Sequence, residues 1–313
     1  GPKIFRDKFK PIELIVNHVN DNVLDTQLAF DTLKRDWIKR LESNKKVLDE
    51  EFKFREINNM CVGSYYTLKN VLEEQGIKHE EHPDHYLDYM FFELEGKPVL
   101  LTKNMYGDQL GEIITDLINR QHICGESENF DIYVLTKAGG LSKNMKRGDL
   151  AIPTSYSSER ALLIENSEDL FKDREVKFEN RLMNSELAQS SVPHGTYSLS
   201  ERNGIKIFSG VKNLGAFSSS TQYRDVLDWA HELGCSTVDM ELGAGQLAAK
   251  KLKETHYDLY LSLNNLFIIS DLPRIGDTLA KENWGNPRFD KGSELGYNLI
   301  LENMKNKVIY SNR

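Results

Sequence analysis

The chain has 313 residues, of which 28% are charged and 39% are hydrophobic, the balance of an ordinary globular protein and not of a disordered or fibrous one. Its formal net charge of −8 argues against a general nucleic-acid coat, because such binding depends on clustered Lys and Arg that neutralise phosphates. We therefore expect a small-molecule ligand and no nucleic-acid partner.

The sequence carries no signal for export, membrane insertion or metal binding. Nowhere do about 18 apolar residues follow one another, and the start of the chain lacks the regions of a signal peptide. Cys61, Cys124 and Cys235 lie far apart, with no CxxC pair and no His spaced to complete a zinc site. We expect a cytoplasmic protein with reduced thiols, without membrane association, metal or cofactor. Gly1-Pro2 resembles the remnant of a protease cleavage, which leaves open a longer natural chain with a further N-terminal domain.

Residues 1–52 are predicted to form an N-terminal helical extension. Apolar side chains recur there at helical spacing among charged residues, as in Leu24, Leu28, Phe30, Leu33, Trp37, Ile38 and Leu41. No chemical motif lies in this stretch, so we expect it to serve packing or assembly. The catalytic domain is then expected to occupy residues 53–313.

From residue 57 onward, predicted strands and helices alternate along the chain. Strands are predicted at 57–64, 89–94, 98–102, 130–135, 149–153, 205–211, 236–240 and 266–269, and helices at 68–75, 109–120, 225–233 and 243–253. The charged stretch 157–194 has few periodic signals and is expected to be an insertion or a lid. This alternation implies an α/β fold with a mixed central sheet flanked by helices, in which ligands bind just beyond the strand ends.

Two predicted strand ends carry adjacent polar motifs: Val238-Asp239-Met240-Glu241 and, further on, Ser270-Asp271. Upstream, in order, lie Gly63, Ala138-Gly139-Gly140-Leu141, Arg147-Gly148-Asp149-Leu150-Ala151-Ile152-Pro153, and the stretch from Ser209 to Ser219. In their order and spacing these motifs resemble the purine nucleoside phosphorylase and nucleosidase family, over roughly residues 57 to 310. The resemblance implies a nucleoside phosphorylase-like fold, with the Met-Glu pair beneath a ribose and the Ser-Asp pair beside the base.

The two carboxylates suit the cleavage of an N-glycosidic bond. A purine leaves a ribose readily only if the charge that builds on the base is neutralised, and Asp271 suits the role of the acid that protonates N7. Because Asp271 follows an apolar strand, we expect desolvation to raise its pKa. The sugar comes to resemble an oxocarbenium ion, and Glu241 suits the role of gripping its 2′- and 3′-hydroxyls and stabilising the positive charge. The structural alternatives are a helix cap for Glu241 and a turn residue for Asp271.

Further substrate contacts are expected around these two carboxylates. Met240 is expected to pack against the sugar face, and the resemblance implies that Phe217 stacks on the base, although a core aromatic explains Phe217 nearly as well. The remaining substrate-binding candidates lie at strand ends: Gly63, Lys137, Gly139, Gly140 and Ser270.

The sequence departs from the family where a phosphate nucleophile would bind. Phosphorylases of the family place one Arg shortly after the first-strand glycine and another at the end of the central strand. Here Thr67 and Val134 stand where those arginines are expected, which favours water as the nucleophile. Lys69 and Lys137 could still bind phosphate as point charges; the alternative without a ligand is that each is an ordinary solvated lysine.

Two features of the expected site stay open in the sequence. The water-activating glutamate of the hydrolytic branch has no clear match, and Glu112 and Glu159 are its candidates. Basic residues gather in one predicted loop and near it, which indicates either a 5′-phosphorylated substrate or a solvated loop: Lys137, Lys143, Lys146 and Arg147.

The sequence thus predicts an enzyme that releases the base from a purine nucleoside or nucleotide by hydrolysis. A phosphorylase is the first alternative, and an inactive nucleoside-binding sensor is the second. Because relatives assemble as dimers, trimers or hexamers, the resemblance also implies a homo-oligomer.

Overall fold

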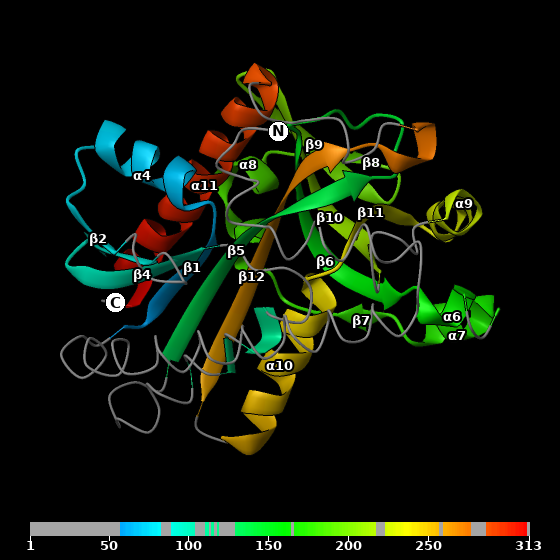
Figure 1. Cartoon of the computed structure of the whole chain (residues 1–313), viewed down its shortest axis with the longest axis horizontal. Helices are drawn as coiled ribbons and strands as arrows, with labels where there is room; N and C mark the ends of the chain where they lie inside the picture. The colour runs from blue at the N-terminus through cyan, green and yellow to red at the C-terminus, as the bar shows by residue number, and fades with distance from the viewer. Residues whose placement is uncertain are drawn as a thin grey trace, which may run out of the picture. The chain divides into compact units, whose positions relative to one another are not determined.

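A mixed β-sheet forms the centre of the computed structural model, which describes residues 57–82, 89–103, 129–163, 166–216, 223–256, 259–276 and 286–311, with scattered positions between 110 and 118 (Figure 1). The extension predicted over residues 1–52 lies outside these residues, so the domain boundary near residue 53 stays a prediction. The strands are β1 (Asn59–Gly63), β2 (His79–His82), β3 (Tyr89–Leu94), β4 (Lys97–Lys103), β5 (Asn129–Gly140), β6 (Leu150–Ser158), β7 (Val176–Lys177), β8 (Val192–His194), β9 (Tyr197–Arg202), β10 (Ile205–Gly215), β11 (Cys235–Asp239) and β12 (Tyr260–Asp271).

Part of the sheet closes on itself. The strand order is β2-β3-β4-β1-β5-β12-β6-β10-β9-β8, and β11 pairs with both β10 and β5. Strands β4, β1, β5 and β12 run parallel to one another, whereas β6, β10 and β11 run parallel to one another in the opposite direction. The strands β5, β12, β6, β10 and β11 therefore form a ring, and β11 is the strand that completes it.

Helices cover both faces of this sheet. The helical elements are α4 (Tyr65–Glu74), α6 (Arg160–Leu163), α7 (Glu168–Asp173), η1 (Arg181–Asn184), α8 (Glu186–Gln189), α9 (Arg224–Glu232), α10 (Leu242–Thr255), η3 (Pro273–Ile275) and α11 (Pro287–Ser311). Gly245 of α10 approaches Leu263, whereas Gly296 of α11 approaches Leu266. Because side chains three apart on a strand point to opposite faces, α10 and α11 lie on opposite sides of β12. The α/β fold with a mixed, helix-flanked sheet is confirmed.

Local turn chemistry explains why the first elements form where the sequence predicts them. Helix α4 ends before Gly76, whose φ of +68° is the left-handed conformation that favours glycine. Glu95 and Gly96 both have positive φ, 51° and 73°, which matches the twist of a two-residue hairpin between β3 and β4. Both predictions are confirmed.

The central strands are longer than their apolar runs. The run predicted at 130–135 continues to Gly140, because β5 pairs with β12 on one side and its last residues pair with β11 on the other. Likewise β12 begins at Tyr260, ahead of the run predicted at 266–269. The small residues Ala138 to Gly140 therefore belong to the strand, not to a loop after it. Helix α11, for which the sequence analysis makes no prediction, packs against α4 and β12.

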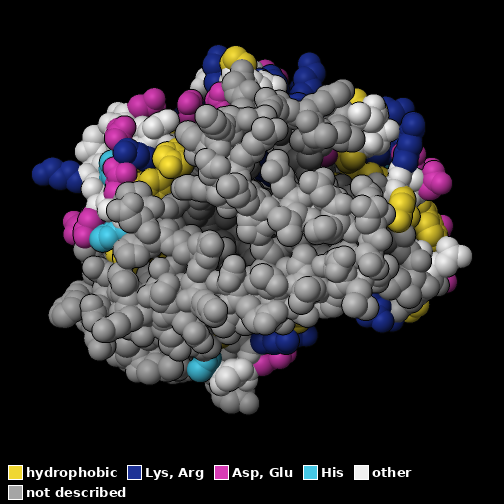
Figure 2. Space-filling view, viewed as in Figure 1, with side chains coloured by type: hydrophobic (Ala, Val, Ile, Leu, Met, Phe, Trp, Pro, Cys, Tyr) yellow, Lys and Arg dark blue, Asp and Glu magenta, His cyan; other side chains and the backbone are white. Residues whose placement is uncertain are grey.

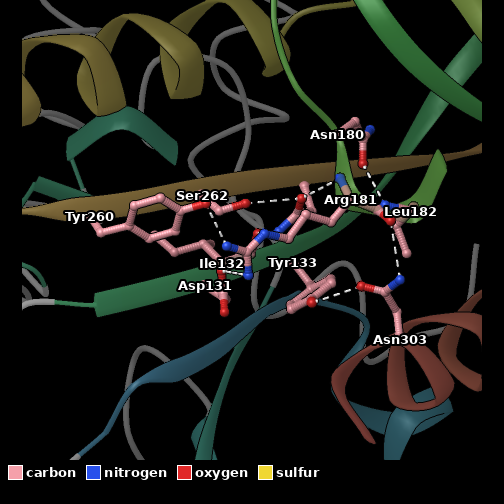
Figure 3. A network of polar contacts seen from close by, with 10 residues as sticks. Asp131, Ile132, Tyr133, Asn180, Arg181, Leu182, Tyr260, Ser262 and Asn303 are labelled. Atoms are coloured by element: carbon pink, nitrogen blue, oxygen red, sulfur yellow. Dashed lines mark hydrogen bonds and ion pairs between the residues drawn. The ribbon is translucent and has the colours of Figure 1, made fainter. Parts of the chain in front are cut away.

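The stretch predicted as an insertion or a lid is anchored in the sheet. Figure 3 shows Arg181 reaching the first residues of β5 and β12: its guanidinium pairs with the buried carboxylate of Asp131 at 2.6 Å and donates to the hydroxyl of Tyr260 at 2.6 Å. The neighbouring Asn180 amide donates to two backbone carbonyls, of Pro153 and Asn265. The Arg181 contacts lie at the ends of β5 and β12 opposite to Gly140 and Asp271, and the Asn180 contacts lie on β6 and in the middle of β12. These anchors favour an insertion over a lid for this part of the stretch.

Among the described residues on the face that Figure 2 shows, charged side chains do not gather by sign. Around the described parts of that face, Lys and Arg side chains alternate with Asp and Glu side chains. Among the described helices, none is long and apolar enough to cross a membrane.

Candidate active site

The end of β5 lies between the two carboxylate motifs. In the strand register Gly139 is paired with Val238 of β11 on one side and with Asp271 of β12 on the other. Two neighbouring strand spacings of about 4.8 Å place the backbones of β11 and β12 about 10 Å apart at this point. The structure thus brings the Met-Glu turn and the Ser-Asp strand end to the two sides of one strand.

Glu241 stands at the first turn of α10, and its side chain is only 5% exposed. Its carboxylate folds back, so that Oε2 accepts the main-chain N–H of Met240 at 3.3 Å. It makes no capping hydrogen bond to α10. The helix-cap reading of Glu241 is therefore wrong.

Asp239 provides the cap in its place. Its Oδ2 accepts the main-chain N–H groups of Glu241 at 3.1 Å and Leu242 at 2.7 Å, and its Oδ1 accepts the amide of Asn213 at 2.6 Å. Burial and the nearby charge of Glu241 raise the pKa of Asp239 to about 7. Asp239 belongs to the motif identified in the sequence, where no role was predicted for it. The available signal was an Asp just ahead of a predicted helix, a residue type that accepts the first N–H groups of helices.

Ser270 and Asp271 end β12 as a hydrogen-bonded pair. The hydroxyl of Ser270 donates to Oδ1 of Asp271 at 2.7 Å, and the carbonyl oxygen of Ala138 lies 3.4 Å from the same hydroxyl. Both side chains are buried, at 1% and 3% exposure. Asp271 is part of the strand and not a turn residue, so its turn reading is wrong.

A Cβ at any of the three glycines of the predicted site would crowd a neighbouring side chain. A Cβ on Gly139 would lie 2.9 Å from the Val238 side chain, and one on Gly140 would lie 2.9 Å from that of Leu272. At Gly63 the hydroxyl of Tyr297, from α11, occupies the place of a Cβ. These contacts account for the glycines without a ligand, so their role in substrate binding stays a prediction.

Lys137 lies within electrostatic reach of Asp271. Solvent still reaches its side chain, yet the surrounding protein lowers the pKa of Lys137 by desolvation, and the charge of Asp271 opposes that shift. Its ammonium also lies over the ring of Phe289, 5.6 Å from the centroid. Met240 is half-buried against the apolar cluster around Val238. Phe217 lies outside the described residues.

The described residues after β1 provide no open cationic site. Lys69 pairs with Glu81 at 2.8 Å and with Glu73 at 3.9 Å, and Val134 is buried in the sheet. Ligand atoms of Glu73, His79 and Glu81 lie within 4.8 Å of one another, as a metal site would require. Lys69 already supplies the positive charge there. Lys69 is thus an ion-pair partner, and its role as a phosphate ligand is not supported.

A cavity of about 400 Å³ adjoins the ends of β5 and β12. Its charged lining combines three cations with two acids: Lys143, Arg224, Arg274, Asp228 and Glu232. Arg274 is held by Asp228 at 2.6 Å and by the carbonyl of Leu141 at 2.7 Å. Neither Glu241 nor Asp271 lines this cavity, and of the basic residues singled out in the sequence only Lys143 does. Arg224 and Arg274 were not predicted from the sequence, because they lie outside the basic loop.

The two candidates for a water-activating base lie in different surroundings. Glu112 is exposed, whereas Glu159 is fully buried directly after β6. The main-chain N–H of Glu159 donates to the carbonyl of Gly215, and Gly215 pairs in register with Asp239. Strand β10 thus lies between Glu159, at the end of β6, and the Asp239 turn, at the end of β11.

Comparisons with known proteins agree with this architecture. The model of the phosphorylase superfamily matches residues 61–253. Among solved structures, a Campylobacter jejuni 5′-methylthioadenosine/S-adenosyl homocysteine nucleosidase is similar at a TM-score of 0.54 and 13% identity, covering 80% of this chain and 99% of its own. Uridine phosphorylase from Schistosoma mansoni, in complex with thymidine, has a TM-score of 0.55 at 12% identity and coverages of 82% and 89%. Purine nucleoside phosphorylase from Toxoplasma gondii has a TM-score of 0.51 at 15% identity and coverages of 79% and 90%. No match was found among curated proteins.

Proposed function

Since the chain belongs to the phosphorylase superfamily, we propose that it cleaves the N-glycosidic bond of a purine nucleoside or nucleotide, with water as the nucleophile. The observation that carries this proposal is the pair of buried carboxylates, Glu241 and Asp271, on the two sides of the end of β5. The fold alone would not distinguish among activities, so the proposal rests on the site.

Asp271 acts as the general acid in this mechanism. Its proton passes to N7 of the purine as the bond between C1′ and the base nitrogen breaks, so the electron pair of that bond stays on a neutral base. The Ser270 hydroxyl fixes one oxygen of Asp271, which orients the carboxyl group. A pyrimidine offers no N7, which is why we propose a purine.

Glu241 acts on the sugar. Its carboxylate accepts from the ribose hydroxyls and faces the positive charge that develops at C1′. Because Asp239 and not Glu241 accepts the first N–H groups of α10, helix capping does not compete for the Glu241 side chain.

Hydrolysis is favoured over phosphorolysis by the residues near Gly63. Lys69 is paired with two glutamates, Val134 is buried, and Tyr297 fills the space beside Gly63. A phosphate dianion needs cationic donors, and Lys69 is committed to its glutamates, which leaves Lys137 as the alternative phosphate-binding charge among the described residues. Water requires only a base, for which the buried Glu159 is better placed than the exposed Glu112. One proton of the water passes to that base, and the water oxygen forms the new bond to C1′.

The substrate class extends to nucleotides because of the cationic part of the cavity lining. Lys143 lies beside the strand ends, while Asp228 pairs with Arg274 at 2.6 Å and with Arg224 at 3.8 Å. A 5′-phosphate would gain from Lys143 and from the largely exposed Arg224.

Incubation with adenosine, inosine and their 5′-monophosphates, with and without inorganic phosphate, tests the function. Free base formed without phosphate, together with ribose or ribose 5-phosphate, is the expected result. Ribose 1-phosphate as the main sugar product would make the protein a phosphorylase, and tight binding without any product would make it a sensor.

A further inference from the structure

Asp239 is a buried carboxylate that the proposed mechanism does not use. It is 3% exposed and accepts three hydrogen bonds, from the main-chain N–H groups of Glu241 and Leu242 and from the amide of Asn213. Asn213 is in turn held by the hydroxyl of Thr237, which donates to its Oδ1 at 2.9 Å. Asn213 and Thr237 are also fully buried.

These contacts fix the backbone that carries Glu241. Three successive N–H groups, those of residues 240 to 242, donate to the two carboxylates: the first to Glu241 and the other two to Asp239. Asn213 belongs to β10 and Thr237 to β11, so these hydrogen bonds tie the turn to two strands of the ring. Displacing the Asp239 side chain would free the turn and the Glu241 carboxylate with it.

We propose that Asp239 is a positioning residue for Glu241, which fixes the turn by its hydrogen bonds and stands as a second buried carboxylate next to that of Glu241. This inference rests on the proposed function, because it assigns to Glu241 the grip on the sugar. Asp239 is assigned no contact with the sugar or the base.

The charged groups near Asp239 make its ionisation sensitive to pH. Burial and the Glu241 charge raise the pKa of Asp239 to about 7, while its N–H donors oppose that shift. On the neighbouring strand β10, the ammonium of Lys212 is engaged by Glu175 at 2.9 Å, and Glu159 follows β6 beside Gly215. Near neutral pH the pair therefore gains a second negative charge as protons leave, which favours a sugar that becomes positive.

Two substitutions separate the hydrogen bonds from the charge. In Asp239→Asn the new carbonyl oxygen can still accept from Glu241 and Leu242, and its NH₂ group can donate to Asn213 once that amide turns over. The turn is then kept and the charge is lost. Asp239→Ala removes both the charge and the acceptor.

The test compares kcat and KM of the full chain and the two variants on the best purine substrate from pH 5.5 to 8.5. We expect Asp239→Ala to lower kcat/KM by about tenfold or more at every pH. For Asp239→Asn, the ratio of wild-type to variant kcat/KM should rise with pH through about 7, because groups common to both proteins cancel in the ratio. Wild-type values of kcat/KM for both variants, with an unchanged pH profile, would overturn the proposal.

A matched control separates positioning from stability. Asp131→Asn alters another buried carboxylate of the sheet, at the far end of β5, about 26 Å from Gly139 at a rise of about 3.3 Å per residue. It should destabilise the fold without moving the pH profile. An equal loss of kcat/KM in all three variants would mean that Asp239 serves only the stability of the fold.

If the wild type cleaves no nucleoside, the proposed function fails, and amide hydrogen exchange then decides whether Asp239 positions Glu241. Exchange at Glu241 and Leu242 should quicken in Asp239→Ala and not in Asp131→Asn, and equal exchange in both would refute it.

Discussion

The hydroxyl of Ser270 donates to Oδ1 of Asp271 at 2.7 Å, between two adjacent and almost fully buried side chains. Ser270→Ala should remove the group that orients the proposed acid and lower kcat by about tenfold, since a hydrogen bond to an ionisable group is worth roughly 1.5–3 kcal/mol. Ser209→Ala is the matched control, because no partner is found for its buried hydroxyl among the described residues. Equal kcat in Ser270→Ala and wild type would show that Asp271 needs no such support.

Asp271→Asn should lower kcat by roughly 10² or more while substrate binding changes little, because the amide keeps the shape but cannot supply the proton. A nitrophenyl riboside has a leaving group that needs no proton, so it should restore turnover if the pocket accepts it. Steady-state kinetics on both substrates provide the measurement. Near-normal turnover of a natural purine substrate by folded Asp271→Asn would remove Asp271 from the role of general acid.

Glu241→Gln should weaken binding and kcat together, since the same carboxylate grips the hydroxyls and faces the positive sugar. The nitrophenyl riboside should not restore this variant, because the charge at C1′ develops whatever the leaving group. Rescue of Glu241→Gln to the same degree as Asp271→Asn would contradict the division of roles.

Gly63→Ala should destabilise the fold by about 1–3 kcal/mol, because the new methyl group would overlap the Tyr297 hydroxyl. Tyr297→Phe removes that oxygen, so it should recover much of the loss in the double variant. Urea unfolding of the four proteins gives the coupling energy. Strictly additive losses would mean that the Leu135 carbonyl, 3.2 Å from the added atom, is the real obstacle.

The raised pKa of Asp239 predicts a pH dependence of stability. Because its pKa is about 7 when folded and about 3.9 in an unfolded chain, the native state holds an extra proton between these values. The free energy of unfolding should therefore fall as pH rises through this window, relative to Asp239→Asn, which has no such proton. Urea unfolding of both proteins at pH 5 and pH 8 measures the difference. A wild-type advantage that is constant or grows with pH would count against a raised pKa.

Local chemistry made part of the fold predictable. The glycine after α4 and the Glu95-Gly96 turn act within a few residues, so their effects can be read from the sequence. The extent of β5 cannot be read in this way, because Thr136 and Lys137 interrupt its apolar run and its continuation depends on pairing with distant strands. For the same reason the anchoring of Arg181 on Asp131 has no local signal.

The candidate site shows the same division. The Met-Glu and Ser-Asp motifs identified both carboxylates, and the register of β5 brings them to one place. The capping role of Asp239 was missed because Asp239 and Glu241 both lie at the start of the helix, on either side of Met240. Which of the two caps the helix depends on the backbone angles, which the sequence does not give. The filling of the space at Gly63 by Tyr297 joins residues from opposite ends of the domain, which no spacing rule relates.

The strand order also limits how copies of this chain can assemble. The two outermost strands are β2, which reads His79-Glu80-Glu81-His82, and β8, whose centre is Pro193. Charged side chains and proline both discourage an edge strand from pairing with a strand of another molecule. The oligomer that the family resemblance implies should therefore form through helix and loop surfaces, and a sheet continuous across the described edges is not expected.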